Sequence, residues 1–441
     1  MTGIDAPVVV VGGGAAAVFV VRALVDEARS AGHPAPRVVV VGDRPDVGRG
    51  LAYGAAEAHH RLNSPAGSMS VSAGDPDGFV RWLGESGWRD TDGQEPRAWS
   101  FAPRVVFGDY LAESFGDLVA GSDGRVAFRQ GEVVDIDVPD IVVPDTAPVA
   151  VTLATGETLE ASAVVLALGN PPPVEVPSAA ERVVVDPWAA GALDAIDESD
   201  RVLLVGTGLT MVDVATSLAR RHPGIRMVAT SRHLLLPAVH PATPAERGPG
   251  LGDDPQTLPA MMRAFRDQLR AASRAGAPWQ GVLDGVRPQV QTLWRRLSLA
   301  DRQRFLVHVA RPWDVARHRM AVPVADELSG LLDAGTLTLE ARVDHAAFDV
   351  AVLCTGPHAV ASEGWSPLVD ALIGRGILRA DPTGLGIDAD ADGALLDASG
   401  RSSDRVFTVG AALKGALWET VASPEIRLGA GRIAGRLTPT G

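Results

Sequence analysis

The sequence contains a single cysteine, Cys354, among its 441 residues. One cysteine cannot form an intrachain disulfide, a thiolate cage for a metal or a redox-active dithiol pair. The chain also lacks a Gly-x-Ser-x-Gly elbow and a His-Glu-x-x-His helix, the signatures of two large hydrolase groups. These absences exclude disulfide-stabilised folds, thiol-based electron relays and the commonest metal or serine hydrolases.

An excess of basic residues and a long apolar run are missing as well. The net charge of -14 argues against a nucleic-acid partner, because phosphate backbones require a basic face. The longest apolar stretch, residues 7–25, is interrupted by three glycines and followed by Asp26 and Glu27, so it predicts no signal peptide and no membrane span. We therefore expect a cytoplasmic protein with neither a membrane nor a nucleic acid as partner, and leave open whether it forms a homo-oligomer.

A glycine-rich turn follows the first run of branched residues. Residues 8–11 are all valine, and Gly12, Gly14 and Ala17 follow at the spacing of a dinucleotide-binding fingerprint, with helical residues 18–28 beyond them. In such a turn the N–H groups at the start of the helix bind a pyrophosphate. The pattern predicts one dinucleotide site.

A second turn of this kind lies 194 positions later. It follows the apolar residues 202–205 and consists of Gly206, Thr207, Gly208, Leu209 and Thr210, with Met211 at the third fingerprint position. Two such turns, each between a strand and a helix, predict two bound dinucleotides. A chain with 46% hydrophobic residues is long enough for the two or three domains that this arrangement needs.

Polar residues follow the next predicted strand of each unit. Asp43 comes after strand 38–41, where an acidic residue accepts a hydrogen bond from a ribose hydroxyl in dinucleotide-binding units. The alternative is that Asp43 is a solvated turn residue. Ser231 and Arg232 follow strand 227–230 in the second unit. A hydroxyl and a guanidinium suit a 2′-phosphate and favour NADPH over NADH, the alternative being an exposed arginine at a strand end.

Three more buried strands end in or near glycine and suggest the domain layout. Strand 164–168 leads into three prolines that indicate a hinge, and strands 350–353 and 406–409 lead to Thr355, Gly356 and Gly410. These three residues suit either close approach of a cofactor or ordinary turns. The layout predicts one dinucleotide-binding domain over residues 1–175 and 346–441, and a second over 176–345.

A helical insertion is predicted within the second domain, at about residues 255–320. Segments 257–275, 282–297 and 300–311 carry apolar residues at helical spacing together with many arginines. Three of the nine tryptophans lie in or beside it, and core packing is the expected role for most of them: Trp279, Trp294 and Trp313.

A series of residues, spread over nearly the whole chain, matches the sequence pattern of one enzyme group. It comprises Gly48, Gly50, Ala52, Tyr53, Leu62, Asn63, Pro65, Met69, Ser70, Arg104, Phe107, Gly108, Tyr110, residues 206–213, Ser231, Arg232, Pro237, His240, Trp313, Arg317, His318, Arg319, Trp418, Glu419, Pro424 and Glu425. Through them the chain resembles flavin-dependent, pyridine-nucleotide-using monooxygenases that include a bacterial FAD-dependent urate hydroxylase and, more distantly, enzymes that N-hydroxylate amino acids such as aspartate.

The resemblance implies roles for several of these residues. Asn63 to Ser70 is similar to the Asn and Met-Ser pattern beside the flavin of flavin-containing monooxygenases, with one residue more. It implies that the Asn63 amide lies near the flavin C4a position, where it can donate and accept hydrogen bonds; a turn cap is the alternative. The matched residues implied to bind the cofactor are Tyr53, Met69, Ser70, Trp418 and Glu419.

A basic group near the end of the insertion is the last candidate. Arg317 and Arg319 flank His318, and Arg311 lies close by in the sequence. We predict that this basic group, with His318 and Arg319 as its catalytic candidates, holds an anionic substrate or a nicotinamide phosphate, with a solvated helix face as the alternative. The chain lacks the Phe-x-Gly-x-x-x-His signature of Baeyer-Villiger enzymes and the Gly-Asp pair of aromatic hydroxylases, which implies a separate branch.

Together these features predict an α/β protein with two Rossmann-like domains that bind FAD and NADPH. Because a cysteine pair is missing, flavin electrons must leave to oxygen, a quinone or a substrate atom. The expected reaction uses NADPH and O2, through a C4a-hydroperoxyflavin, to hydroxylate a small polar nitrogen-containing substrate, either an amine or amino acid or a purine such as urate. The alternatives are an NAD(P)H oxidase or reductase and a non-catalytic flavin sensor.

Overall fold

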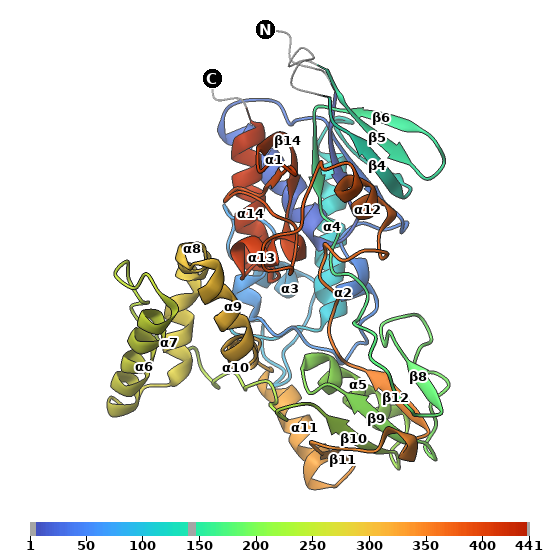
Figure 1. Ribbon diagram of the computed structural model, residues 1–441, viewed down its shortest axis with the longest axis vertical. Coiled ribbons are helices and arrows are strands. Elements are labelled where there is room, and N and C mark those ends of the chain that lie inside the picture. Colours follow the sequence, from blue (N-terminus) through green and yellow to red (C-terminus); the bar gives the residue numbers. More distant parts are fainter. Residues whose placement is uncertain (1–5, 140–146, 439–441) are drawn as a thin grey trace. The chain divides into compact units, whose positions relative to one another are not determined.

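The computed structural model describes residues 6–139 and 147–438 (Figure 1). The chain divides into two compact units, each built on its own parallel sheet. The first unit contains the chain up to Gly54, Pro65–Asn170 and the chain from Ala359 onward, and the second contains Ala55–Ser64 and Pro171–His358. The chain therefore passes between the units four times.

The first unit has a six-stranded sheet in the order β13-β14-β7-β1-β2-β3, in which β13 and β14 alone are antiparallel. Its strands are β1 (Val8–Val11), β2 (Val38–Gly42), β3 (Val126–Gln130), β7 (Ala163–Leu166), β13 (Ala394–Leu396) and β14 (Ser402–Thr408). Every residue of β1 is buried, because parallel sheets are covered on both faces and their central strands consist of branched apolar residues.

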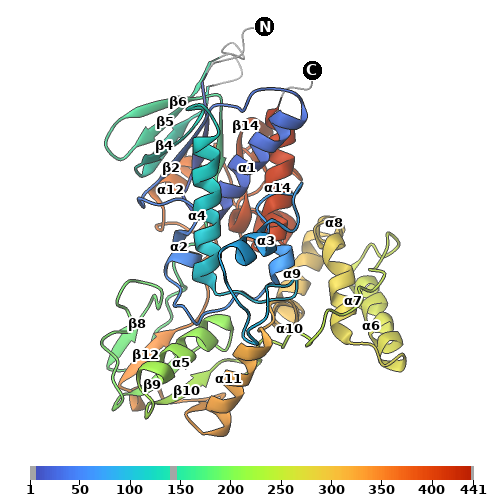
Figure 2. The same ribbon diagram turned by 180° about the vertical axis from the view of Figure 1, so that it is seen from behind.

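Helices and a small antiparallel sheet complete the first unit. The helices are α1 (Ala15–Ser30), α2 (Gly50–Gly54), α3 (Gly78–Glu85), α4 (Arg104–Ala120), α12 (Pro367–Gly374), α13 (Lys414–Leu417) and α14 (Ser423–Leu437), and the small sheet contains β4 (Val133–Asp137), β5 (Val149–Leu153) and β6 (Thr158–Ala161). Helices α1 and α14 lie side by side, and α1 also contacts α4 (Figures 1 and 2). Helix α12 packs on β4.

The second unit has a five-stranded, all-parallel sheet in the order β11-β10-β9-β12-β8. Its strands are β8 (Arg182–Val184), β9 (Arg201–Val205), β10 (Arg226–Thr230), β11 (Leu337–Leu339) and β12 (Val350–Leu353), and helices α5 (Leu209–Arg221) and α11 (Val322–Asp333) pack together beside it. Met211, which replaces the third fingerprint glycine, is fully buried in the core of this unit. The larger side chain is therefore accommodated by the packing of α5.

The predicted insertion is helical, with more breaks than expected. It contains α6 (Leu258–Arg274), α7 (Trp279–Val286), α8 (Val290–Arg296), α9 (Leu299–His308) and α10 (Ala310–Arg317). The expected helix 282–297 is divided by a 3-10 turn at Pro288, whose ring removes a backbone donor. Trp294 is buried as predicted, whereas Trp279 is 38% exposed and is not a core residue.

Two boundaries differ from the expected layout. The sequence predicts that the chain returns to the first unit at about residue 346, but the return occurs at Ala359, because β12 pairs with β9 of the second sheet. The segment Ala55–Ser64, expected in the first domain, belongs to the second unit. This second difference transfers Asn63 to the unit of the second glycine turn.

The predicted fold class is confirmed. In each unit one strand of the parallel sheet, β1 or β9, leads through a glycine turn into a helix and lies between two parallel neighbours. No helix in residues 6–139 and 147–438 has the length and apolar character needed to cross a membrane.

Candidate functional site: two glycine turns and a buried polar cluster

Both glycine turns close against the end of a neighbouring strand. Gly12 has φ +110°, and a Cβ added there would lie 2.3 Å from the carbonyl oxygen of Ala167, just after β7. Gly206 has φ +124°, and its added Cβ would lie 2.3 Å from the carbonyl oxygen of Cys354, just after β12. Only glycine fits either position. The turns thus occupy the same place in each sheet, at the switch point where open α/β sheets bind ligands.

The backbone at the start of both helices is open to a ligand. Gly14 is the N-cap of α1 and Gly208 the N-cap of α5, and no side chain caps either helix. An added Cβ on Gly14 would come no closer than 3.9 Å to neighbouring described atoms, and one on Gly208 would come no closer than 4.0 Å, to Arg311 Nη1. The residues present therefore fit a pyrophosphate bound to the helix N–H groups.

Three more fingerprint residues lie in the first helical turns. Ala17 is fully buried in α1, where a small side chain allows close packing of helix and sheet. Leu209 and Thr210 begin α5 and are both partly exposed. Their backbone N–H groups belong to the unpaired first turn, where a bound anion would be stabilised.

Asp43 lies directly after β2 beside the first turn. It is exposed, and its carboxylate makes no hydrogen bond or ion pair with residues 6–139 and 147–438. Its carbonyl oxygen accepts a hydrogen bond from Gln130 Nε2 at 3.2 Å. The Gly48 N–H donates to the Gly13 carbonyl at 2.8 Å, so the loop following Asp43 is held against the turn. The carboxylate is available to a ribose hydroxyl.

The three residues assigned by resemblance in the first third of the chain differ in exposure. The partly exposed Tyr53 ring meets Phe107 edge to face at 4.9 Å between centroids, and burial raises the pKa of its hydroxyl. Met69 and Ser70 are buried, and the Ser70 hydroxyl donates to the Asp75 carbonyl at 2.5 Å. The Ser70 side chain is therefore engaged by its own loop.

The C-terminal candidates surround a strained turn. Gly410 has φ +80°, and an added Cβ would meet no described atom within 4 Å. Trp418 has φ 65° and ψ -72°, and the Glu419 N–H donates across it to the Leu417 carbonyl at 3.0 Å. This is a γ-turn of the rare positive-φ type, and such strain concentrates at functional sites. Trp418 and Glu419 are both buried.

The two residues that follow β10, Ser231 and Arg232, differ in their contacts. The Ser231 hydroxyl accepts the Leu234 N–H at 3.0 Å and lies 2.9 Å from Thr207 Oγ1, which itself donates to the Leu235 carbonyl. Because Thr207 uses its hydrogen on Leu235, Ser231 must donate to Thr207. Arg232 is exposed and has no polar partner in the described parts of the chain. Arg232 alone is therefore free to donate to a 2′-phosphate.

Thr355 and Gly356 tie together two connecting segments. The Thr355 hydroxyl donates to the Val174 carbonyl at 2.7 Å, and the Val174 N–H donates to the Gly356 carbonyl at 2.9 Å. Gly356 has φ +82°, as a glycine in a turn can. Both residues thus hold the chain after β12 to residues 173–174, and the Thr355 hydrogen is used there.

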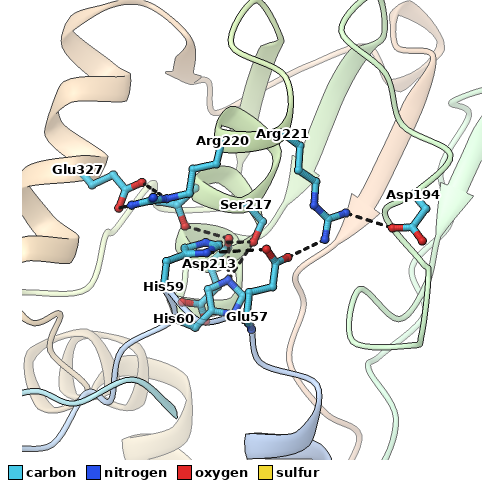
Figure 3. A network of polar contacts seen from close by, with 10 residues as sticks. Glu57, His59, His60, Asp194, Asp213, Ser217, Arg220, Arg221 and Glu327 are labelled. Carbon is cyan, nitrogen blue, oxygen red and sulfur yellow. Dashed lines mark hydrogen bonds and ion pairs between the residues drawn. The ribbon is translucent and has the colours of Figure 1, made fainter. Parts of the chain in front are cut away.

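The segment that carries Asn63 is attached to α5 through His60 (Figure 3). His60 Nδ1 accepts the Glu57 N–H at 3.0 Å, so its Nε2 holds the proton and faces Ser217 Oγ at 2.9 Å and the Asp213 carbonyl at 3.3 Å. His60 and Ser217 are buried. This arrangement requires neutral His60 and connects the segment to a buried face of the helix.

Ion pairs surround this contact on its exposed side (Figure 3). Arg221 joins Glu57 at 2.7 Å and Asp194 at 3.2 Å, and Arg220 forms two hydrogen bonds with Glu327, at 2.7 and 2.9 Å. The pairs link the segment, α5 and α11. Exposed pairs of this kind contribute little individually, about 0–1 kcal/mol each.

Asn63 is attached through its backbone, which leaves its amide uncommitted. His240 Nε2 donates to the Asn63 carbonyl at 3.0 Å, and burial lowers the pKa of His240 to about 4. His240 is in turn held by its own N–H, which donates to the Met320 carbonyl at 2.9 Å. The Asn63 side chain makes no hydrogen bond with residues 6–139 and 147–438. It is not the turn cap that was the alternative prediction.

Arg319 has a different role from the predicted one. Its guanidinium is 2% exposed and meets both oxygens of Asp284 at 3.0 Å, the Ala316 carbonyl at 2.9 Å and the Gln280 carbonyl at 3.4 Å. The Trp279 ring lies 5.2 Å from the guanidinium carbon. Arg319 therefore does not form the predicted anion site. Its contacts stabilise the fold instead, because a buried cation must be paired within the protein.

His318 was predicted beside Arg319 in that site. It is partly buried at the C-terminal end of α10, where its N–H donates to the Asp314 carbonyl at 2.8 Å. The role of His318 in binding an anion stays a prediction.

Sequence reasoning missed three contributors to these sites. His240 was recognised only as a matched position, and its contact with Asn63 spans 177 residues. Asp284 lies 35 residues before Arg319 and has no distinguishing neighbours in the sequence. Thr207 occupies the variable position of the second turn, where a hydroxyl is a weak indication of function. Each contact arises from tertiary packing, which local patterns do not encode.

Comparison with known proteins supports the dinucleotide-binding architecture. Residues 9–171 match a family model described as FAD-NAD(P)-binding, which confirms the predicted dinucleotide-binding character of this part of the chain. No curated protein matches the sequence.

Solved structures resemble the whole chain. An ornithine hydroxylase from Pseudomonas aeruginosa is 15% identical with a TM-score of 0.60, and an L-lysine 6-monooxygenase from Pseudomonas syringae is 19% identical with a TM-score of 0.61. An ornithine N-hydroxylase from Kutzneria sp. 744, solved with reduced FAD, NADP+ and L-ornithine, is 17% identical with a TM-score of 0.61. Each match covers 98% of both chains. At these identities the likeness establishes the fold.

Proposed function

We propose that the protein is a FAD-dependent monooxygenase that uses NADPH and O2 to hydroxylate the nitrogen of a small polar amine or amino acid. One observation carries the proposal: the chain aligns from end to end with ornithine and lysine hydroxylases, covering 98% of both chains in each case. Such complete coverage includes the helical insertion as well as both dinucleotide-binding units. Urate hydroxylation, the alternative from sequence, has no counterpart among the three solved structures compared above.

The first unit would hold FAD. Its glycine turn leaves the N–H groups of α1 open to a pyrophosphate, and the uncommitted Asp43 carboxylate lies after β2, where an adenosine ribose is bound in this architecture. When bound, FAD supplies the redox chemistry, accepting a hydride from NADPH and reacting with O2.

The second unit would hold NADPH. Gly206 and Gly208 repeat the arrangement of the first turn, and the exposed Arg232 follows β10 with its donors unused. A guanidinium can meet a phosphate with two parallel hydrogen bonds, which supports a preference for the 2′-phosphate of NADPH. We also propose a role for Asn63. Its amide would donate a hydrogen bond to the oxygen atom that is transferred to the substrate.

The decisive test combines four measurements on purified protein loaded with FAD. NADPH oxidation, O2 consumption and peroxide are recorded with a panel of ornithine, lysine, cadaverine, aspartate and urate, and products are identified by mass. A monooxygenase gives a substrate-stimulated rate and a product heavier by one oxygen atom. Peroxide in stoichiometric amount with every compound would identify an oxidase, and a lack of turnover in all assays would identify a sensor.

A further inference from the structure

Arg311 from the insertion reaches the second glycine turn. It lies near the start of α10, and its Nη2 donates to the Leu235 carbonyl at 3.0 Å and approaches Thr207 Oγ1 at 3.4 Å. Its Nη1 lies 4.0 Å from the position that a Cβ on Gly208 would occupy. The guanidinium thus lies beside Thr207 and Gly208 of the turn. Arg311 and Thr207 are 104 residues apart in the sequence.

The electrostatic setting of Arg311 is unfavourable in the free protein. It is half-buried beside the start of α5, where the helix dipole presents partial positive charge, and α5 has no acidic residue in its first turn. Burial lowers the pKa of Arg311, and Asp314 is the carboxylate that opposes this shift. Helix dipole and guanidinium therefore both favour an anion in front of the turn.

The position of Arg311 distinguishes the pyrophosphate of NADPH from its 2′-phosphate. Arg311 contacts the middle of the turn, at Thr207 and Gly208, where the architecture binds the pyrophosphate. Arg232 follows β10, at the place that reads the ribose 2′ position. The two arginines are therefore suited to different groups of one ligand.

We propose that Arg311 binds the pyrophosphate of the nicotinamide dinucleotide and so makes the helical insertion part of the cofactor site. This inference rests on the proposed function, because it assumes that the second turn binds NAD(P)H. It predicts that Arg311 serves NADPH and NADH alike, whereas Arg232 serves NADPH alone.

Arg311 also has a local structural contact that must be separated from this role. Its hydrogen bond to Leu235 duplicates one from Thr207, which donates to the same carbonyl at 2.8 Å. Loss of the guanidinium therefore leaves that carbonyl satisfied, and the turn should keep its conformation. Arg311→Met retains the apolar stem, and Arg311→Lys retains the charge without the planar fork.

The test measures equilibrium binding by calorimetry, so it does not depend on turnover. NADP+, NAD+ and adenosine 2′-phosphate are titrated into the FAD-loaded wild type, Arg311→Met, Arg311→Lys and Arg232→Met. Arg295→Met serves as the matched control, because Arg295 is an exposed arginine of α8 in the same insertion. Melting temperatures verify that each variant is folded.

Arg311→Met should weaken NADP+ and NAD+ about tenfold to a hundredfold and leave adenosine 2′-phosphate unchanged, since a charge-assisted contact is lost only from the dinucleotides. Arg311→Lys should lose less affinity for NADP+ and NAD+ than Arg311→Met. Arg232→Met should weaken NADP+ and adenosine 2′-phosphate but not NAD+. Wild-type affinities in folded Arg311→Met, or a loss confined to the 2′-phosphate ligands, would overturn the assignment. A wild type that binds neither dinucleotide would refute the proposed function together with this inference.

Discussion

At the scale of single residues, the fold leaves three polar side chains uncommitted at the candidate sites: those of Asp43, Asn63 and Arg232. The Asp43 carboxylate and the Asn63 amide have no polar partners in residues 6–139 and 147–438, although backbone contacts hold both residues in place. Other candidates, such as Ser70 and Thr355, use their hydroxyl hydrogens within the protein. Uncommitted groups on held backbone are pre-organised for a ligand, because binding need not break an existing contact.

Asp43→Ala should weaken FAD retention by about 1.5–3 kcal/mol, the range of a hydrogen bond to a charged group. Purified wild type should be yellow and release FAD, whereas the variant should lose the cofactor on gel filtration and bind added FAD less tightly. Glu160→Ala is the control, because Glu160 is an exposed acid on the edge strand β6. Equal FAD affinity in Asp43→Ala and wild type would remove Asp43 from the site.

Asn63→Ala should keep reduction of FAD by NADPH but divert electrons from product to hydrogen peroxide. The substitution removes the amide while the backbone contact with His240 remains, so the segment should keep its position. The ratio of product to NADPH consumed measures the coupling, and Asn63→Asp tests whether the donor half of the amide is needed. If both variants couple as well as wild type, the amide has no part in the reaction.

At the scale of elements, buried charge pairs and hydrogen bonds fix how the segments of the second unit connect. Arg319 joins α7 to the residues that precede α11, and His60 joins segment 55–64 to α5. Arg319, His60 and Ser217 are shielded from water, whereas the Asp284 side chain is 26% exposed. Removing one partner therefore costs more than the contact itself, because the other partner remains desolvated.

Asp284→Asn should lower the free energy of unfolding by about 3 kcal/mol, at the lower end expected for a broken buried pair because the Asp284 side chain is 26% exposed. Replacing both residues, as in Asp284→Asn with Arg319→Met, should recover part of this loss because no unpaired charge remains. Urea unfolding of the two single variants and the double variant measures the coupling. Strictly additive losses would show that the pair acts as two independent residues.

At the scale of the whole molecule, one buried histidine should contribute to acid sensitivity. Burial lowers the pKa of His240 from 6.5 to about 4, so in this range the unfolded chain takes up a proton that the folded protein excludes. Stability contributed by neutral His240 is full above pH 6.5 and is lost as the pH falls toward 4. The loss amounts to about 3 kcal/mol by pH 4.

His240→Gln tests this pH dependence. A glutamine amide can donate to the Asn63 carbonyl without titrating, so the variant should show a smaller fall in unfolding free energy between pH 6.5 and 4 than the wild type. Denaturant unfolding at several pH values gives both slopes. Parallel pH profiles of wild type and variant would show that another group controls acid sensitivity.

Local sequence patterns determined much of the fold. Residues 8–11 and 350–353 form strands at the predicted positions, and the glycine turns open helices in both units. These features follow from the backbone conformations that each residue type favours. Runs of branched apolar residues favour buried parallel strands, and Gly12 and Gly206 adopt a positive φ that other residues avoid. The position of Asp43 directly after β2 is also predicted from the sequence, because it depends only on the distance from one strand end.

Only the tertiary structure decided which side chains are free and which are engaged. Arg319 and Arg311 lie in one arginine-rich segment, yet the first is paired with Asp284 while the second reaches Thr207 and the open glycine turn. Their sequence neighbourhoods do not distinguish them, because both partners lie tens of residues away. The association of Asn63 with the second unit likewise depends on His240, a contact made only after the chain has packed.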